Sequence, residues 1–253
     1  AMRAAELSGG YFDPTVGPLV AAWGFHYKEG MTMTPEIVDS LRQMVGYKKV
    51  KIEDGRVVKE NPNMTLDFNA VAQGYTTDKI GEFLLSKGVD NFLVDVGGEI
   101  MAKGNKPDGD LWKVGIEKPA ENKDASRIVQ EIVELKDKSI VTSGNYRKYV
   151  EQDGKRYSHS LNPMTGYPSE NNLLSATIIC DNTAWADCLA SICMLVGMEK
   201  AIEIIDTQDN VEAFFIYEEN AECSLVEENG RAHFLTKRFD RIGGEKVHMQ
   251  TLC

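Results

Sequence analysis

The chain has 253 residues, of which 42% are hydrophobic and 26% charged, fractions typical of a globular protein that exclude collagen-like, coiled-coil and disordered chains. Its 28 basic and 39 acidic side chains give a formal net charge of −11 without a basic cluster, so we expect no binding to nucleic acid or anionic lipid. No run approaches the ~18 apolar residues of a membrane-spanning helix, and no charged-then-apolar leader opens the chain.

The first hundred residues predict helices that alternate with short strands. Residues 34–36, Thr-Pro-Glu, are typical of a helix start with threonine as the N-cap, and Ile37, Leu41 and Val45 follow at a spacing of four on the expected buried face. In chain order we expect a helix over 1–7 that ends at 8–10, a short helix over 16–25 and the helix from 35. A hairpin of 49–53 with 56–59 around Asp54-Gly55 follows. After it we expect a short strand over 64–68, a loop over 69–74, a helix over 76–87, and a strand over 91–96 that Gly97-Gly98 interrupts.

The rest of the chain predicts mostly strands. The expected elements are strands over 111–117, 128–135 and 139–142, a hairpin of 146–151 with 155–159, a strand over 173–180, a helix over 183–196 that Thr183 caps and Gly197 ends, a helical continuation over 199–205, and strands over 211–217, 223–226 and 231–235. Hairpin turns join most neighbouring strands, which favours an α+β fold with mixed, largely antiparallel sheets and packed helices over a doubly wound nucleotide fold. No repeat or linker marks a boundary, so we expect one domain over 1–253.

The five cysteines are an odd number without a CxxC pair, which excludes zinc-ribbon and thioredoxin-type redox sites. Cys188 and Cys193 lie in an apolar helical stretch, where we expect buried, unreactive thiols. The number of cysteines does not indicate a cellular compartment.

The expected helix over 183–196 is apolar nearly all round, which is typical of a buried helix. Asp187 and Ser191 interrupt it four residues apart, so both side chains lie on one face. A buried carboxylate needs a partner, and two readings are open. In the first, Asp187 complements the helix dipole and Ser191 bonds the carbonyl four residues back; in the second, both give oxygen ligands to a hard cation such as Mg²⁺.

Three further segments are candidates for a binding or catalytic site. Residues 67–75 contain small side chains ahead of a helix, which lets a backbone approach an anion, although they match neither a P-loop nor a GxGxxG pattern. His159 ends a strand beside a Pro-Gly turn, where it is either structural or suited to proton transfer near neutral pH. Residues 13–18 and 142–146 are polar turns within apolar sequence. None of these segments alone establishes a function.

Taken together, six motifs in this order closely resemble the ApbE-type FAD:protein FMN transferases over about residues 11–239. The motifs are DPTVGP (13–18), DFNAVAQGY (67–75), VDVGGEI (94–100), TSGNYRKY (142–149), HSLNPMTG (159–166) and ADCLAS (186–191). The resemblance implies the flavin transferase fold and a Mg²⁺-dependent reaction in which FMN passes from FAD to a threonine hydroxyl of a partner protein and AMP leaves. It also implies a partner that is a flavoprotein subunit of a membrane redox complex, and a periplasmic location at the bacterial inner membrane as an exported lipoprotein.

The same resemblance implies roles for individual residues. Asp187, Ser191 and the backbone carbonyl of Ala70 match the magnesium ligands, with serine where most members have threonine. Gln73 stands where many members have a lysine against the cofactor, which removes one positive charge.

The remaining implied roles concern FAD and proton transfer. Thr15, Gly17, Leu161 and Thr165 match positions near FAD, and His159 matches the proposed proton acceptor. Family members usually carry a further N-terminal segment, so the chain is expected to be truncated relative to them.

Two alternatives to the transferase stay open. The same residues would serve a Mg²⁺-dependent FAD pyrophosphatase, in which water replaces the threonine and FMN and AMP are released. A flavin-binding module without turnover is the other alternative, in view of Gln73 and the expected truncation. The sequence predicts no oligomeric state.

Overall fold

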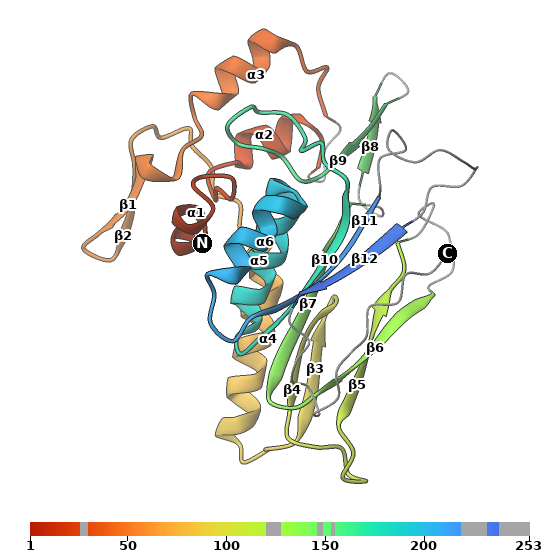
Figure 1. The fold of residues 1–253 in the computed structure, drawn as a ribbon. Coiled ribbons are helices and arrows are strands. Elements are labelled where there is room, and N and C mark those ends of the chain that lie inside the picture. Colours follow the sequence, from red (N-terminus) through yellow and green to blue (C-terminus); the bar gives the residue numbers. More distant parts are fainter. Residues whose placement is uncertain (26–29, 120–127, 146–148, 153–154, 219–231, 238–253) are drawn as a thin grey trace, which may run out of the picture.

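The computed structural model of the protein describes residues 1–25, 30–119, 128–145, 149–152, 155–218 and 232–237. Its centre is a six-stranded sheet in the spatial order β12-β11-β10-β7-β4-β3 (Figure 1). The strands are β3 (Phe92–Val96), β4 (Glu99–Lys103), β7 (Lys138–Gly144), β10 (Leu173–Cys180), β11 (Glu212–Glu218) and β12 (Ala232–Lys237). Every neighbouring pair in this sheet is antiparallel, which agrees with the α+β fold that the hairpin turns predict.

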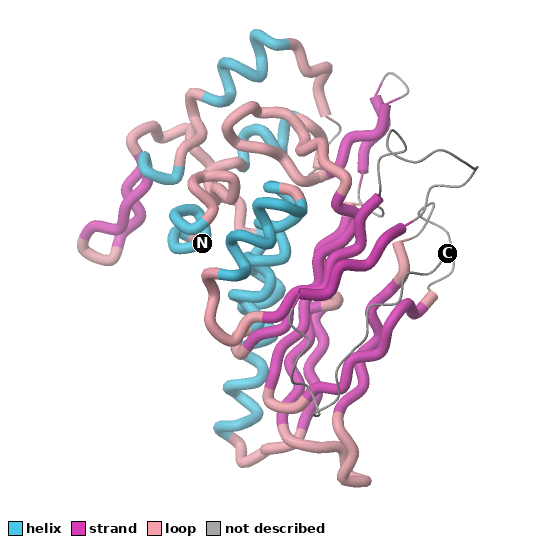
Figure 2. The backbone as a smooth tube through the Cα atoms, in the orientation of Figure 1, coloured by secondary structure: helices cyan, strands magenta, loops and turns pink. Residues whose placement is uncertain are grey.

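Helices cover one face of the six-stranded sheet and a two-stranded hairpin covers the other (Figure 1 and Figure 2). The helices are α4 (Asn69–Ser86), α5 (Thr183–Val196) and α6 (Met198–Asp206), and the hairpin pairs β5 (Trp112–Glu117) with β6 (Val129–Leu135). The pleat of β10 sends Ile178 into the core cluster beneath the helices and its neighbour Ile179 into the cluster beneath the hairpin. The two faces of one sheet therefore carry two cores.

The N-terminal elements lie at one end of this sandwich (Figure 1). They are α1 (Met2–Leu7), α2 (Gly17–Ala22), α3 (Pro35–Arg42), a short 3₁₀ turn (Tyr47–Lys49) and the hairpin of β1 (Val50–Glu53) with β2 (Arg56–Lys59). Later in the chain, a separate hairpin pairs β8 (Tyr149–Gln152) with β9 (Lys155–Ser158). Leu19 and Trp23 of this part pack with Val45 and Leu161 in a third core cluster. This cluster attaches the segment after β9 to the N-terminal helices.

Several local predictions are confirmed. The Thr34 side chain caps α3 by accepting a hydrogen bond from the Ile37 N–H at 3.4 Å. Asp54 and Gly55 have φ angles of 49° and 73°, as the tight β1–β2 turn requires. The predicted buried face of α3 is wrong in part. The helix ends at Arg42, so the buried Val45 lies outside it, and the buried residue of α3 is Val38 rather than Ile37 or Leu41.

The expected strand over 64–68 and the loop over 69–74 are wrong. Residues 65–68 form no strand, and α4 begins at Asn69, seven residues before the predicted start. The Asp67 carboxylate accepts the Asn69 N–H at 2.8 Å, and the N–H groups of Val71 and Ala72 donate to the Phe68 carbonyl. These local bonds start the helix early, and its small residues serve helix packing rather than a loop.

One strand was missed, and one cap needs correction. Gly97-Gly98 ends β3 after Val96, as predicted, and turns the chain into β4, a strand that the sequence did not indicate. Asn182, and not Thr183, is the N-cap of α5, because its side chain accepts the Trp185 N–H at 2.8 Å. The expected strand over 223–226 lies outside the described residues.

The described cysteines are buried, as predicted for Cys188 and Cys193. Burial raises the pKa of the Cys188 thiol to about 12 and that of Cys180 to about 11, and it also raises the pKa of Cys193. These thiols therefore stay protonated at neutral pH. Among the described residues, no helix combines the length and the apolar character that a bilayer crossing requires.

Candidate functional site

The candidate site begins with the way α4 and α5 pack against each other. Asp78 near the middle of α4 contacts the first residues of α5, and Gly74, one turn earlier on α4, contacts Asp187, one turn later on α5. The helices are therefore antiparallel: moving four residues toward the start of α4 corresponds to moving four residues toward the end of α5. By the same spacing, Ala70 lies opposite Ser191.

Glycine at position 74 allows this close packing. A Cβ at this position would lie 2.5 Å from the Thr183 carbonyl oxygen, 2.8 Å from Cα of Ala184 and 2.9 Å from Cβ of Asp187. With no side chain in the way, the Gly74 N–H donates a hydrogen bond to Oδ2 of Asp187 at 3.1 Å. The carboxylate of α5 is thus held against the first turns of α4.

The backbone of α4 departs from helical geometry at Ala70, with φ −85° and ψ 20°. In a regular helix the Ala70 carbonyl would accept the N–H of residue 74, which here donates to Asp187. Ala70 therefore lies one helical turn before the residue that contacts Asp187, on the face of α4 that packs against the core cluster of α5. A carbonyl, a carboxylate and a hydroxyl are oxygen donors, the set that a hard cation such as Mg²⁺ prefers.

The donor set contains one carboxylate only. Among the described residues there is no group of three or more His, Cys, Asp or Glu side chains placed to hold a metal ion. A cation at this place would therefore complete its coordination with water or with an anionic ligand such as a phosphate, which is common for Mg²⁺. The residues present fit such a shared site.

Asp187 is 4% exposed and lies in the second turn of α5. The role of dipole partner that its position suggests is filled by Asp78, whose carboxylate accepts the N–H groups of Thr183 and Ala184, both at 2.9 Å. Position 187 is therefore not required for the charge balance of the helix N-terminus.

His159 directly follows β9 and is half-buried. The turn after it is closed by two hydrogen bonds of 2.8 Å, from the Asn162 N–H to the Tyr167 carbonyl and from the Gly166 N–H to the Asn162 carbonyl. The indole N–H of Trp23 donates to the Gly166 carbonyl at 2.9 Å and so fixes this turn on the N-terminal helices. The fold thereby fixes the turn that follows His159.

A cavity of about 640 Å³ joins the turn after His159 to the C-terminal end of α5. Asn162 and the exposed residue Thr165 line it from the turn, and Leu195 and Val196 line it from the helix. Leu195 is one helical turn beyond Ser191. The structure therefore brings Thr165 and the end of α5 to one cavity, close to where Ser191 lies.

The other predicted FAD positions are integrated into the protein interior. Thr15 is fully buried, and its hydroxyl donates to Oδ1 of Asp13 at 2.6 Å and accepts the Gly46 N–H at 2.7 Å. A Cβ on Gly17 would lie 2.5 Å from Oγ1 of Thr65, and Leu161 is 4% exposed in the third core cluster. Contacts from these residues to a ligand would therefore use their backbone.

Gln73 connects two of the motifs. Its side-chain amide donates to the Val96 carbonyl at 3.4 Å, and the Thr77 hydroxyl lies 3.0 Å from the carbonyl oxygens of both Gln73 and Glu99. The start of α4 thus packs on the β3–β4 turn. Sequence reasoning did not select Gly74 or Asp78, although both follow Ala70 at intervals of four within one helix, and this spacing was the available signal.

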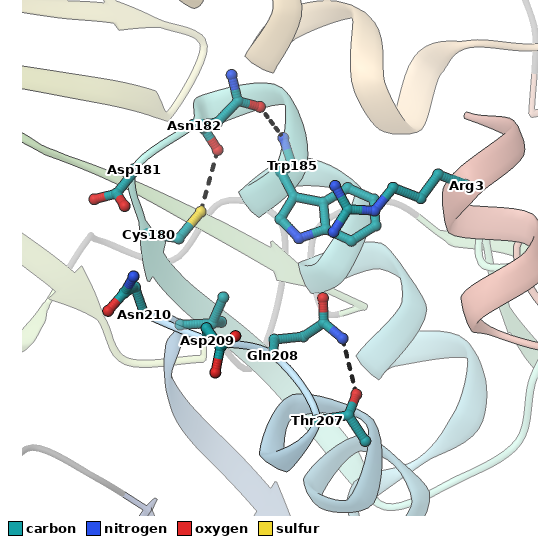
Figure 3. Close-up of a pocket in the computed structure, with 10 residues that line it drawn as sticks. Arg3, Cys180, Asp181, Asn182, Trp185, Thr207, Gln208, Asp209 and Asn210 are labelled. Carbon is teal, nitrogen blue, oxygen red and sulfur yellow. Dashed lines mark hydrogen bonds between the residues drawn. The ribbon is translucent and has the colours of Figure 1, made fainter.

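A second cavity of about 290 Å³ lies at the opposite, N-terminal end of α5 (Figure 3). Asp181, Asn182 and Trp185 line it, and the Arg3 guanidinium lies 4.2 Å from the centre of the Trp185 ring. None of the predicted site residues lines this cavity. This second cavity is therefore not part of the candidate site.

The fold and this site define an α+β protein with an antiparallel sheet and a set of oxygen donors between two helices. The model of the ApbE family matches residues 1–215, and the chain belongs to this family. It is 38% identical over 208 residues to the FAD:protein FMN transferase of Vibrio cholerae, which covers 81% of this chain and 61% of that protein, and 34% identical over 210 residues to the one of Escherichia coli K12, covering 81% and 59%.

Solved structures agree with the fold. The flavin transferase ApbE from Vibrio cholerae has a TM-score of 0.79 at 33% identity, with 93% of this chain and 72% of that chain covered. The apo form of the flavinyl transferase ApbE from Pseudomonas stutzeri also has a TM-score of 0.79 at 33% identity, covering 97% and 73%. The chain spans about three fifths of the length of the first curated relatives that it matches.

Proposed function

We propose that this chain is a transferase that moves FMN from FAD to a threonine hydroxyl of a partner flavoprotein, with Mg²⁺ as cofactor and AMP as the leaving product. The observation that carries the proposal is the antiparallel packing of α4 on α5, whose matched four-residue spacing supports a site made by the Ala70 carbonyl, Asp187 and Ser191. Relatives with the name FAD:protein FMN transferase support it. The cavity that Thr165 lines reaches Leu195, which is one helical turn beyond Ser191.

The site residues would have separate roles in binding the metal and the ligand. Asp187, Ser191 and the Ala70 carbonyl would hold Mg²⁺, which neutralises diphosphate charge when it is bound. The neutral Gln73 amide at the start of α4 would orient the diphosphate without adding charge, and Thr165 lines the cavity that would receive part of FAD. A protein with a formal net charge of −11 needs such a cation to bind an anionic ligand.

His159 would accept the proton of the attacking threonine. The hydroxyl oxygen forms a bond to the phosphorus of the FMN half of FAD, the bond from that phosphorus to the bridging oxygen breaks, and AMP leaves with the bridging oxygen. The proton of the hydroxyl passes to the imidazole and then to solvent. A positioned general base of this kind typically contributes about 10²- to 10⁴-fold to a rate.

The remaining parts of the proposal rest on the resemblance to the family. We infer a single flavin transferase domain, a target subunit of a membrane redox complex, and a location on the periplasmic face of the bacterial inner membrane in the form of an exported lipoprotein. Fusion of the protein, expressed from its own gene, to a reporter that is active only after export tests the location directly. A reporter that stays inactive would contradict it.

The function is tested by incubating the chain with FAD, MgCl₂ and a threonine-containing peptide from a candidate target. We expect the peptide to gain the mass of FMN and an equal amount of AMP to appear. AMP together with free FMN, without peptide modification, would instead support the pyrophosphatase alternative. Binding of FAD without either product would support the flavin-binding module.

Two variants assign the roles. Asp187→Asn keeps the side-chain shape, so we expect a folded protein without Mg²⁺-dependent AMP release, whereas Asp39→Asn removes the same charge from the exposed face of α3 and should stay active. His159→Ala should bind FAD as the parent does but transfer FMN about 10²- to 10⁴-fold more slowly. An unchanged rate at saturation would mean that His159 is not the base.

A further inference from the structure

Asp78 is a buried carboxylate that accepts three hydrogen bonds from the start of another helix. It lies on α4, is 5% exposed, and accepts hydrogen bonds from the Asn182 side-chain amide at 2.8 Å and from the N–H groups of Thr183 and Ala184 at 2.9 Å. These three donors are the N-cap and the first two residues of α5. The carboxylate of one helix therefore caps another helix.

This cap completes the start of α5. The helix has no acidic residue in its own first turn, so Asp78 supplies the negative charge that its N-terminus favours. Asn182 accepts the next N–H, that of Trp185. Charge-assisted hydrogen bonds of this kind are stronger than neutral ones, and they offset the cost of burying the carboxylate.

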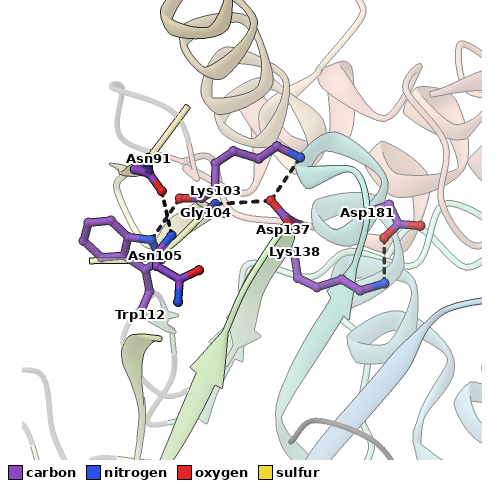
Figure 4. Close-up of polar contacts among 8 residues, drawn as sticks. All are labelled: Asn91, Lys103, Gly104, Asn105, Trp112, Asp137, Lys138 and Asp181. Carbon is purple, nitrogen blue, oxygen red and sulfur yellow. Dashed lines mark hydrogen bonds and ion pairs between the residues drawn. The ribbon is translucent and has the colours of Figure 1, made fainter. Parts of the chain in front are cut away.

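The start of α5 is also fixed on the sheet. The hydroxyl groups of Ser139 on β7 and Thr183 are 2.7 Å apart. The ammonium of Lys138, also on β7, lies 2.6 Å from the Asp181 carboxylate (Figure 4). The position of α5 is thus set by β7. Asp78 then sets the position of α4 along α5, because its carboxylate binds the fixed end of that helix.

The same face of α4 carries Gly74 and Ala70, at four and eight residues before Asp78. A helix rises about 1.5 Å per residue, so a slip of α4 by one residue would move the Ala70 carbonyl by that amount relative to Asp187 and Ser191. Metal sites tolerate displacements of only about 0.5 Å. The geometry of the candidate site therefore depends on a contact two helical turns away from it.

We propose that Asp78 is a positioning residue that sets the register of α4 against α5, and with it the placement of the Ala70 carbonyl opposite Asp187 and Ser191. Asp78 does not belong to the donor set itself. The part of the inference that concerns the cation rests on the proposed function, whereas the register of the two helices does not.

The first measurement needs no metal. Asp78→Asn replaces an acceptor oxygen with an amide group that faces two N–H donors, and we expect amide exchange at Gly74, one turn away, to become at least about tenfold faster by NMR. Ile116→Val, in the core cluster beneath the β5–β6 hairpin, serves as a control for general loss of stability. Asp78→Glu keeps the charge and should restore part of the protection.

The second measurement uses Mn²⁺ as a probe for the cation, followed by electron paramagnetic resonance. We expect Asp78→Asn to weaken Mn²⁺ binding at least about tenfold, and excess MgCl₂ to restore its rate of FMN transfer, since the donors remain in place. Asp187→Asn should not be restored, because it lacks the only carboxylate of the donor set.

Three outcomes are decisive. Faster exchange at Thr183 and Ala184 with unchanged exchange at Gly74 would limit Asp78 to a local cap and overturn the proposal. A parent protein that neither binds Mn²⁺ nor transfers FMN would refute the proposed function, while faster exchange at Gly74 in the variant would still support the role in register. Weaker Mn²⁺ binding in Ile116→Val to the same extent would overturn the link between Asp78 and the donors.

Discussion

Replacement of Gly74 by alanine is the most direct test of the helix pair. The added Cβ would lie 2.5 Å from the Thr183 carbonyl oxygen and 2.8 Å from Cα of Ala184. Both atoms are backbone atoms of α5, so they cannot move aside by a change of rotamer. The helices must separate by several tenths of an ångström at least, and the 3.1 Å hydrogen bond from Gly74 to Asp187 must lengthen.

The size of the effect follows from two opposing contributions. Overpacking a rigid interior costs about 1–3 kcal/mol, whereas alanine is favoured over glycine inside a helix by about 0.8–1 kcal/mol. Loss of a hydrogen bond to a buried carboxylate adds about 1.5–3 kcal/mol. We therefore expect Gly74→Ala to lower the free energy of unfolding by about 2–4 kcal/mol, which corresponds to a fall in Tm of about 4–15 °C.

Gly81 provides a matched control on the same helix. A Cβ at position 81 would meet the sulfur of Met101, which is near the end of a flexible side chain and can move. Gly81→Ala should therefore leave the protein as stable as the parent or stabilise it by up to about 1 kcal/mol through helix propensity. Helix propensity alone predicts that both substitutions raise the free energy of unfolding, so a decrease for Gly74→Ala would come from the packing against α5.

Thermal unfolding followed by circular dichroism measures both variants, and Mn²⁺ binding measures the effect on the donors. Gly74→Ala should lose stability and at least about tenfold in Mn²⁺ affinity, and Gly81→Ala should lose neither. Equal stability of the two variants would refute the close packing at Gly74. A strong loss of stability with normal Mn²⁺ affinity would refute the assignment of Asp187 as a ligand.

Two further predictions concern groups away from the site. Because burial raises the pKa of Cys188 to about 12 and also that of Cys193, iodoacetamide at pH 8 should label neither thiol before unfolding, as peptide mass spectrometry can show; labelling of the folded protein would contradict their burial. Burial also raises the pKa of Glu212, whose Oε2 makes no hydrogen bond within the described part of the chain. A raised folded-state pKa favours folding at low pH and is a cost at neutral pH, so Glu212→Gln should raise Tm by about 1–3 °C at pH 7 and by less near pH 4. A gain in Tm that is larger at pH 4 than at pH 7 would contradict a raised pKa of Glu212 in the folded protein.

The parts of the fold that the sequence predicted well depend on short-range signals. Thr34 and the following proline mark the start of α3, Asp54-Gly55 marks a hairpin, and Gly197 ends α5 where predicted. In each case the residues that determine the structure lie within a few positions of one another. Elements of this kind can be recognised without knowledge of the distant contacts.

The missed elements depend on distant partners. β4 pairs with β7 through Ile100 and Ile140, forty residues apart, and the two glycines before β4 indicated an interruption rather than a turn. The small residues at the start of α4 have the composition of a ligand-binding loop, but Gly74 is small because α5 packs directly against it. Small residues in a sequence predict that some group comes close to the backbone. Only the fold shows whether that group is a ligand or, as at Gly74, another helix.

The two readings of Asp187 illustrate the same dependence. An acidic residue early in a buried helix suggests a partner for the helix dipole, and this reading is sound as long as no other carboxylate is near. The structure brings Asp78 to that end of α5 from a position more than one hundred residues earlier, so the dipole is compensated from another helix. Because the charge of Asp187 is not needed there, its place beside Gly74 and opposite the Ala70 turn favours the reading as a ligand. An acidic residue can be assigned to catalysis or to stability only when the carboxylates that share its surroundings are known.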